Sequence, residues 1–117
     1  MNRYFIIGFV LVIVSFVIYR MKNASNDSLA KVKEKISSGA LVVDVRTKAE
    51  FNSGHFPGAV NIPINEVQNQ LGKFGDKNRP IVLYCASGGR SGMALSQLQS
   101  EGFTDVTNAG GLSDMPK

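Results

Sequence analysis

The sequence predicts an α/β fold: an open, mostly parallel sheet with helices on both faces, preceded by one transmembrane helix. Along residues 28–117, short and nearly continuous apolar runs alternate with stretches of helical periodicity, which is typical of strands covered on both faces. Residues 4–19 form an uncharged run near the start of the 117-residue chain. We therefore expect an anchor over residues 1–22, a polar linker over 23–27 and one domain over 28–117.

The N-terminal segment has the features of an uncleaved membrane anchor. Its uncharged run spans about 24 Å as a helix, and snorkelling of Arg20 and Lys22 extends it toward the ~30 Å of a bilayer core. Tyr4 and Tyr19 suit the two membrane interfaces. A cleaved signal peptide with an exported domain is the alternative, but Lys22 lies close to the cleavage site it would need. Basic residues after the run favour a cytoplasmic domain.

Composition excludes several functions. Of the net charge of +4, three charges come from Arg3, Arg20 and Lys22, and the remaining residues hold 10 basic and 9 acidic side chains. No basic patch with interleaved aromatic residues is present, so we expect no nucleic-acid partner. One cysteine excludes an intramolecular disulfide. One cysteine and one histidine cannot complete a metal coordination shell, so we expect no metal site and no cofactor.

The first half of the domain begins with a helix that Ser28 can cap, with Leu29, Val32 and Ile36 on one side. An apolar strand follows, then a short helical or turn segment and a loop rich in glycine and proline. The expected elements are a helix over 28–36, a strand over 41–45, a helix or turn over 47–51, a loop over 52–58 and a strand over 59–62.

The second half repeats the alternation and brings the only cysteine to the end of a strand. The expected elements are a helix over 64–71, a loop over 72–79, a strand over 80–84, a loop over 85–91, a helix over 91–101, a strand over 104–107 and a turn over 108–111. In open parallel sheets, ligands bind at the carboxyl ends of the strands. Cys85 follows directly on the third strand and is therefore expected at the functional edge.

Cys85 is predicted to be a nucleophile rather than a small buried core residue. It lies at a strand end, under a helix N-terminus and near Arg90, and each of these stabilises a thiolate. Gly88 and Gly89 allow positive φ, so that successive backbone N–H groups can point inward as an anion-binding nest.

The rest of the loop supplies further donors around the sulfur. Arg90 offers a fork of N–H groups suited to an oxyanion, and Ser87 and Ser91 can add hydroxyl donors. With Ala86 completing the loop, the sequence predicts a cradle for an anionic substrate or an anionic sulfur species, with the thiolate at its base.

The chain resembles the rhodanese family of sulfurtransferases over about three quarters of its length, residues 28–115. The resemblance rests on Leu41-Val42-Val43-Asp44-Val45-Arg46-Thr47, Glu50-Phe51, Gly54-His55-Phe56-Pro57-Gly58-Ala59-Val60-Asn61-Ile62-Pro63, Val82-Leu83-Tyr84-Cys85, Gly89-Arg90-Ser91 and Asn108-Ala109-Gly110-Gly111. It implies a parallel α/β fold and sulfane-sulfur transfer through a persulfide on Cys85. Loop amides would hold the persulfide and Arg90 would attract the donor. Asp44 and Arg46 match a pair that supports the site from behind.

The implied reaction moves sulfur from thiosulfate or a persulfide donor to a thiol or cyanide acceptor. A non-enzymatic persulfide carrier or membrane-bound interaction module is an alternative, as is a cysteine-dependent phosphatase. Phosphatases of that kind place five residues between cysteine and arginine, whereas four separate Cys85 from Arg90. The loop also contains no acid to protonate a leaving group. Loop length therefore favours sulfur transfer.

Overall fold

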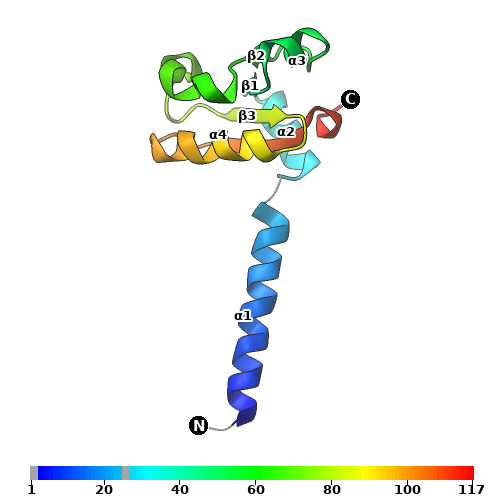
Figure 1. Ribbon diagram of the computed structural model, residues 1–117, viewed down its shortest axis with the longest axis vertical. Helices are drawn as coiled ribbons and strands as arrows, with labels where there is room; N and C mark the ends of the chain where they lie inside the picture. The colour runs from blue at the N-terminus through cyan, green and yellow to red at the C-terminus, as the bar shows by residue number, and fades with distance from the viewer. Residues whose placement is uncertain (1–2, 25–26) are drawn as a thin grey trace.

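The computed structural model describes residues 3–24 and 27–117 of the chain (Figure 1). The described residues form the α-helices α1 to α4 and the 3₁₀ helices η1 and η2. The elements in chain order are α1 (Arg3–Ala24), α2 (Leu29–Ser37), β1 (Leu41–Asp44), α3 (Lys48–Asn52), β2 (Val60–Asn61), η1 (Ile64–Phe74), β3 (Ile81–Cys85), α4 (Gly89–Ser100), β4 (Val106–Gly111) and η2 (Leu112–Asp114).

The four strands form one sheet in the order β2-β1-β3-β4. All three neighbouring pairs are parallel, which confirms the predicted parallel α/β fold. Val43 of β1 lies beside Val60 on one side and Leu83 on the other. The pairing of β3 with β4 shifts after Leu83, so that Cys85 lies opposite Gly111. The carboxyl ends of β3 and β4 therefore meet at the edge where the cysteine emerges.

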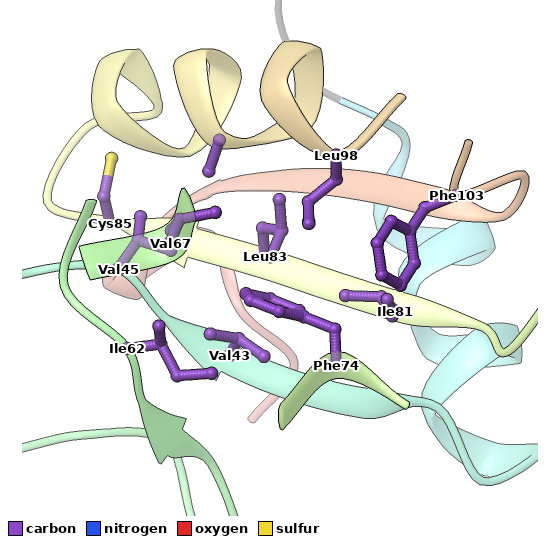
Figure 2. Close-up of a cluster of buried hydrophobic side chains, with 11 residues drawn as sticks. Val43, Val45, Ile62, Val67, Phe74, Ile81, Leu83, Cys85, Leu98 and Phe103 are labelled. Atoms are coloured by element: carbon purple, nitrogen blue, oxygen red, sulfur yellow. The ribbon is translucent and has the colours of Figure 1, made fainter. Parts of the chain in front are cut away.

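Helices cover both faces of the sheet, as predicted. Because side chains alternate along a strand, Leu83 and Cys85 contribute to one buried cluster, and Val82 and Tyr84 contribute to the other. The first cluster also takes residues from η1 and α4, and Figure 2 shows Cys85 and Leu83 on the α4 side of the sheet. The second takes residues from α2 and η2. Cys85 is thus fixed in the face that α4 covers.

Burial explains two of the differences between the predicted and the observed boundaries. The helix expected over 64–71 corresponds to η1, which kinks at Gln70 (φ −128°, ψ 32°) and ends at Phe74. Phe74 is fully buried and meets Phe103 edge to face, with ring centroids 6.0 Å apart. The expected turn over 108–111 is instead the second half of β4, where Asn108 and Ala109 are buried. Packing against the sheet overrides the local turn preference of Asn and Gly at these positions.

The N-terminal helix α1 extends away from the sheet in Figure 1. Its described apolar side chains, such as Phe9, Leu11 and Val12, are exposed. No helix in the described part of the chain is long and apolar enough to cross a membrane. The predicted transmembrane anchor over residues 1–22 is therefore not supported. Residues 25 and 26 of the expected linker lie outside the described residues.

Candidate active site

The sulfur of Cys85 lies at the end of β3 beneath the start of α4 (Figure 2). The residue is buried, with 1% of its surface exposed. The backbone N–H of Gly88 donates a hydrogen bond to Sγ over 2.9 Å, and the hydroxyl of Ser91 lies 3.4 Å from Sγ. These donors enclose the sulfur from the loop side and from the helix side.

The surroundings of Cys85 favour its ionised form. Burial by itself raises the pKa of the thiol, because it removes water from the thiolate. Hydrogen bonds from the side chain and backbone of Ser91 and from the amides of Ser87 and Gly88 oppose burial and leave the pKa below its usual value. A thiolate hydrogen-bonded in this way is the reactive form of cysteine.

The helix after the cysteine begins at Gly89, two residues earlier than the sequence predicts. Gly88 caps it with φ of 102°, a left-handed conformation that glycine adopts without strain. Gly89, which the sequence places in the loop as a second residue that allows positive φ, lies within the helix and does not adopt it. Arg90 and Ser91 therefore belong to the first turn of α4. The first amides of that turn have no partner within the helix, so they can donate to an anion at the sulfur.

The remaining loop residues form the mouth of the site. Ala86, Ser87 and Gly89 are exposed, whereas Gly88 and Ser91 are buried next to the sulfur. The structure thus brings every residue that the sequence predicts for the cradle to one place.

Asn108 on β4 is a buried part of the site that the sequence analysis missed. Its Oδ1 accepts hydrogen bonds from the Ser91 hydroxyl at 2.8 Å and from the Gly110 N–H at 3.0 Å. Its Nδ2 donates to the carbonyl of Gly88 over 3.3 Å. The sequence predicts a turn at Asn108, and only the pairing of β4 with β3 reveals that this residue links the loop to the first turn of α4.

Arg90 is already engaged by Glu50, a second residue whose role the sequence analysis missed. Nη1 lies 2.6 Å from Oε1 and Nη2 lies 3.0 Å from Oε2. Glu50 is the third helical residue of α3 and forms a capping box with Thr47. The Thr47-x-x-Glu50 spacing is a sequence signal for that box, but nothing in the sequence links Glu50 to an arginine 40 positions away.

Asp44 and Arg46 form a buried ion pair behind the site. Arg46 Nη2 lies 2.7 Å from Oδ2 of Asp44 and donates to the carbonyl of Gly54 over 2.6 Å. The hydrogen bond to Asp44 raises the pKa of Arg46. The guanidinium lies 5.7 Å from the ring centroid of Tyr84, whose hydroxyl accepts from the N–H of Phe56. This network fastens the loop after α3 to the strand that ends in the cysteine.

The comparisons with known proteins identify the class. The rhodanese-like domain family matches residues 28–114, so the chain belongs to that family. Over 78 residues, 64% of this chain and 75% of the other, it is 42% identical to the thiosulfate sulfurtransferase PspE of Escherichia coli strain K12.

Two solved structures extend the comparison to the fold. A rhodanese from E. coli solved with anions aligns with a TM-score of 0.63 and 40% identity, over 67% of this chain and 95% of that one. The human single-domain sulfurtransferase TSTD1 aligns with a TM-score of 0.67 and 29% identity, over 74% and 89% of the two chains. Within its family, this protein is a rhodanese-type sulfurtransferase.

Proposed function

We propose that the enzyme moves sulfane sulfur from thiosulfate or a persulfide donor to a thiol or cyanide acceptor, and that Cys85 carries the sulfur as a persulfide. The observation that supports this proposal is the environment of the Cys85 sulfur. The thiol has a lowered pKa and lies under the first turn of a helix. Its sulfur accepts a hydrogen bond from the backbone N–H of Gly88 over 2.9 Å. Such a thiolate can attack the outer sulfur of a donor and hold the product anion.

Each half of the proposed cycle is a displacement at sulfur. With thiosulfate, the Cys85 thiolate attacks the sulfane sulfur, a new S–S bond forms, the donor S–S bond breaks and sulfite leaves with the electron pair. The enzyme then holds Cys85–S–S⁻. Cyanide attacks the terminal sulfur, which gives thiocyanate and regenerates the thiolate. An acceptor thiolate attacks the same terminal sulfur, takes it up as a persulfide and also regenerates the Cys85 thiolate. Atoms and charges balance without an added oxidant or reductant.

The neighbouring residues have distinct proposed roles. The amides of Gly88 and Gly89 and the donors of Ser87 and Ser91 hold the terminal sulfur anion, with Ala86 shaping the loop. Arg90 orients the donor through N–H groups that Glu50 leaves free. Asp44 and Arg46 act from behind by fixing the end of β1 next to β3, since their ion pair is buried and already satisfied.

Phosphatase activity is the weaker candidate. Only Ala86 to Gly89 separate the cysteine from the arginine, and α4 already begins at Gly89. The resulting ring of amides closes around one sulfur atom and suits a single added sulfur better than a tetrahedral phosphate with its in-line leaving group.

A paired assay of the full chain tests the proposal. Thiosulfate plus cyanide should yield thiocyanate, while an aryl phosphate should yield no phosphate. Cys85→Ser, which replaces one atom in a buried position, should abolish thiocyanate formation and keep the fold, as circular dichroism would show. Thiocyanate formation by the serine variant at the wild-type rate would refute the role of Cys85. Phosphate release without thiocyanate would refute sulfur transfer.

A further inference from the structure

The ion pair between Glu50 and Arg90 lies at the mouth of the cradle. Each side chain is about one third exposed, 35% for Glu50 and 33% for Arg90. Arg90 is also close enough to Cys85 for the sulfur's charge to contribute to raising the arginine pKa, after the larger effect of the Glu50 hydrogen bond. An incoming sulfur donor therefore meets the charge of the pair rather than that of a free guanidinium.

Glu50 is held in place independently of Arg90. The N–H and the hydroxyl of Thr47 lie 3.3 Å and 3.1 Å from Oε1 of Glu50, and the Glu50 N–H lies 3.2 Å from Oγ1 of Thr47. This capping box keeps the carboxylate on the first turn of α3. The hydrogen bond from Arg90 and the amide of Thr47 lower the pKa of Glu50 to about 2. The Glu50 carboxylate is therefore ionised at every pH at which Cys85 is a thiolate.

The charges around the sulfur do not favour a dianion. The Cys85 thiolate and Glu50 each carry a negative charge and Arg90 one positive charge, while Asp44 and Arg46 cancel each other behind the site. The side-chain balance at the mouth is thus one negative charge. Coulomb repulsion grows with the charge of the donor, so it acts more strongly on dianionic thiosulfate than on a thiol-borne persulfide, whose persulfide group carries at most one negative charge.

We propose that Glu50 is a specificity-determining residue, which neutralises Arg90 and thereby favours thiol-borne persulfides over thiosulfate as sulfur donors. This inference rests on the proposed function of Cys85. In the favoured step the thiolate attacks the outer sulfur of R–S–S–H. The new S–S bond forms on Cys85, the donor S–S bond breaks, R–S⁻ leaves with the electron pair, and the proton stays on the transferred sulfur.

Glu50→Gln tests the proposal, because the substitution removes the negative charge of Glu50 and keeps the size of the side chain. The amide oxygen of glutamine can still accept the hydrogen bonds that Thr47 donates. Single-turnover reactions are quenched over time, and intact-mass spectrometry counts one added sulfur on Cys85. The two donors are thiosulfate and the persulfide of 2-mercaptoethanol, whose only ionisable group is the persulfide. We expect the thiosulfate rate constant to rise about tenfold and the persulfide rate constant to change less than about threefold. Added salt should make the effect of Glu50→Gln on the thiosulfate rate constant smaller, because salt screens the repulsion.

Glu34→Gln is the matched control, since it removes the same charge from an exposed position on α2 and should change neither rate. The proposal is overturned if Glu50→Gln leaves the ratio of the two rates unchanged. It is equally overturned if both rates fall together, because that result marks a structural role. If both donors load wild-type Cys85, the proposed function stands whatever Glu50→Gln does. If neither donor loads it, the proposed function fails as well.

Discussion

At the scale of single residues, the hydroxyl of Ser91 lies near three acceptors, of which the Gly110 carbonyl oxygen, at 3.5 Å, is the most distant. It lies 2.8 Å from Oδ1 of Asn108 and 3.4 Å from Sγ of Cys85. A hydroxyl has one proton to donate. Oδ1 of Asn108 also accepts from the Gly110 N–H at 3.0 Å, so it keeps a partner when the proton of Ser91 turns to the sulfur. Ser91 is thus placed to stabilise a thiolate without leaving Oδ1 of Asn108 unpaired.

Ser91→Ala should raise the pKa of Cys85, because it removes one of the hydrogen bonds that hold that pKa down. The thiolate population then falls at lower pH and is unchanged well above the pKa. We expect alkylation of Cys85 by iodoacetamide to be several-fold slower on the acid side, with its midpoint moved to higher pH. Ser96→Ala, on the exposed face of α4, is the control. An unmoved midpoint in Ser91→Ala would show that backbone amides alone stabilise the thiolate.

At the scale of elements, the end of β4 limits where the cysteine loop can lie. Gly111 pairs with Cys85 across the sheet, and a Cβ on Gly111 would collide with the carbonyl oxygen of Ala86. Since backbone rather than a flexible side chain is in the way, either the loop or β4 has to move. Close contact between two backbones therefore sets the shape of the cradle.

Gly111→Ala should reduce kcat/KM for thiosulfate at least tenfold and destabilise the fold by about 1–3 kcal/mol, the usual cost of overpacking. Gly72→Ala is the control, because Gly72 has no positive φ and its Cβ would meet no atom within 4 Å. Steady-state kinetics and denaturant unfolding provide the two readouts. Wild-type kinetics in Gly111→Ala would contradict a loop position fixed by β4.

The sequence identifies elements and local motifs well, but it does not identify contacts between distant elements. The continuous apolar run at the third strand and the glycines after Cys85 suffice to predict a strand, a loop and a helix around the thiol. The predicted start of α4 is two residues late because the sequence places Gly89 in the loop as a second residue that allows positive φ, whereas of these two glycines only Gly88 adopts it. Glu50 and Asn108 join the site only through the parallel pairing of strands, which no local pattern encodes.

At the scale of the whole molecule, location in the cell stays a prediction. The described apolar side chains of α1 are exposed, and we propose that a membrane covers them with the domain on the cytoplasmic side. The full chain should then sediment with membranes and keep its N-terminus. N-terminal sequencing that begins after residue 22 would instead indicate a cleaved signal peptide. Protease access to the domain from outside intact cells would contradict the orientation alone.

The central claim is that Cys85 carries the transferred sulfur, and mass spectrometry of the peptide that contains Cys85 tests it most directly. The purified chain is treated with thiosulfate, freed of excess donor and digested, and the peptide that contains Cys85 is analysed. We predict a gain of one sulfur atom on Cys85 that disappears when cyanide is added, with thiocyanate released in equal amount. An unmodified Cys85 in a chain that still converts thiosulfate and cyanide to thiocyanate would contradict the account.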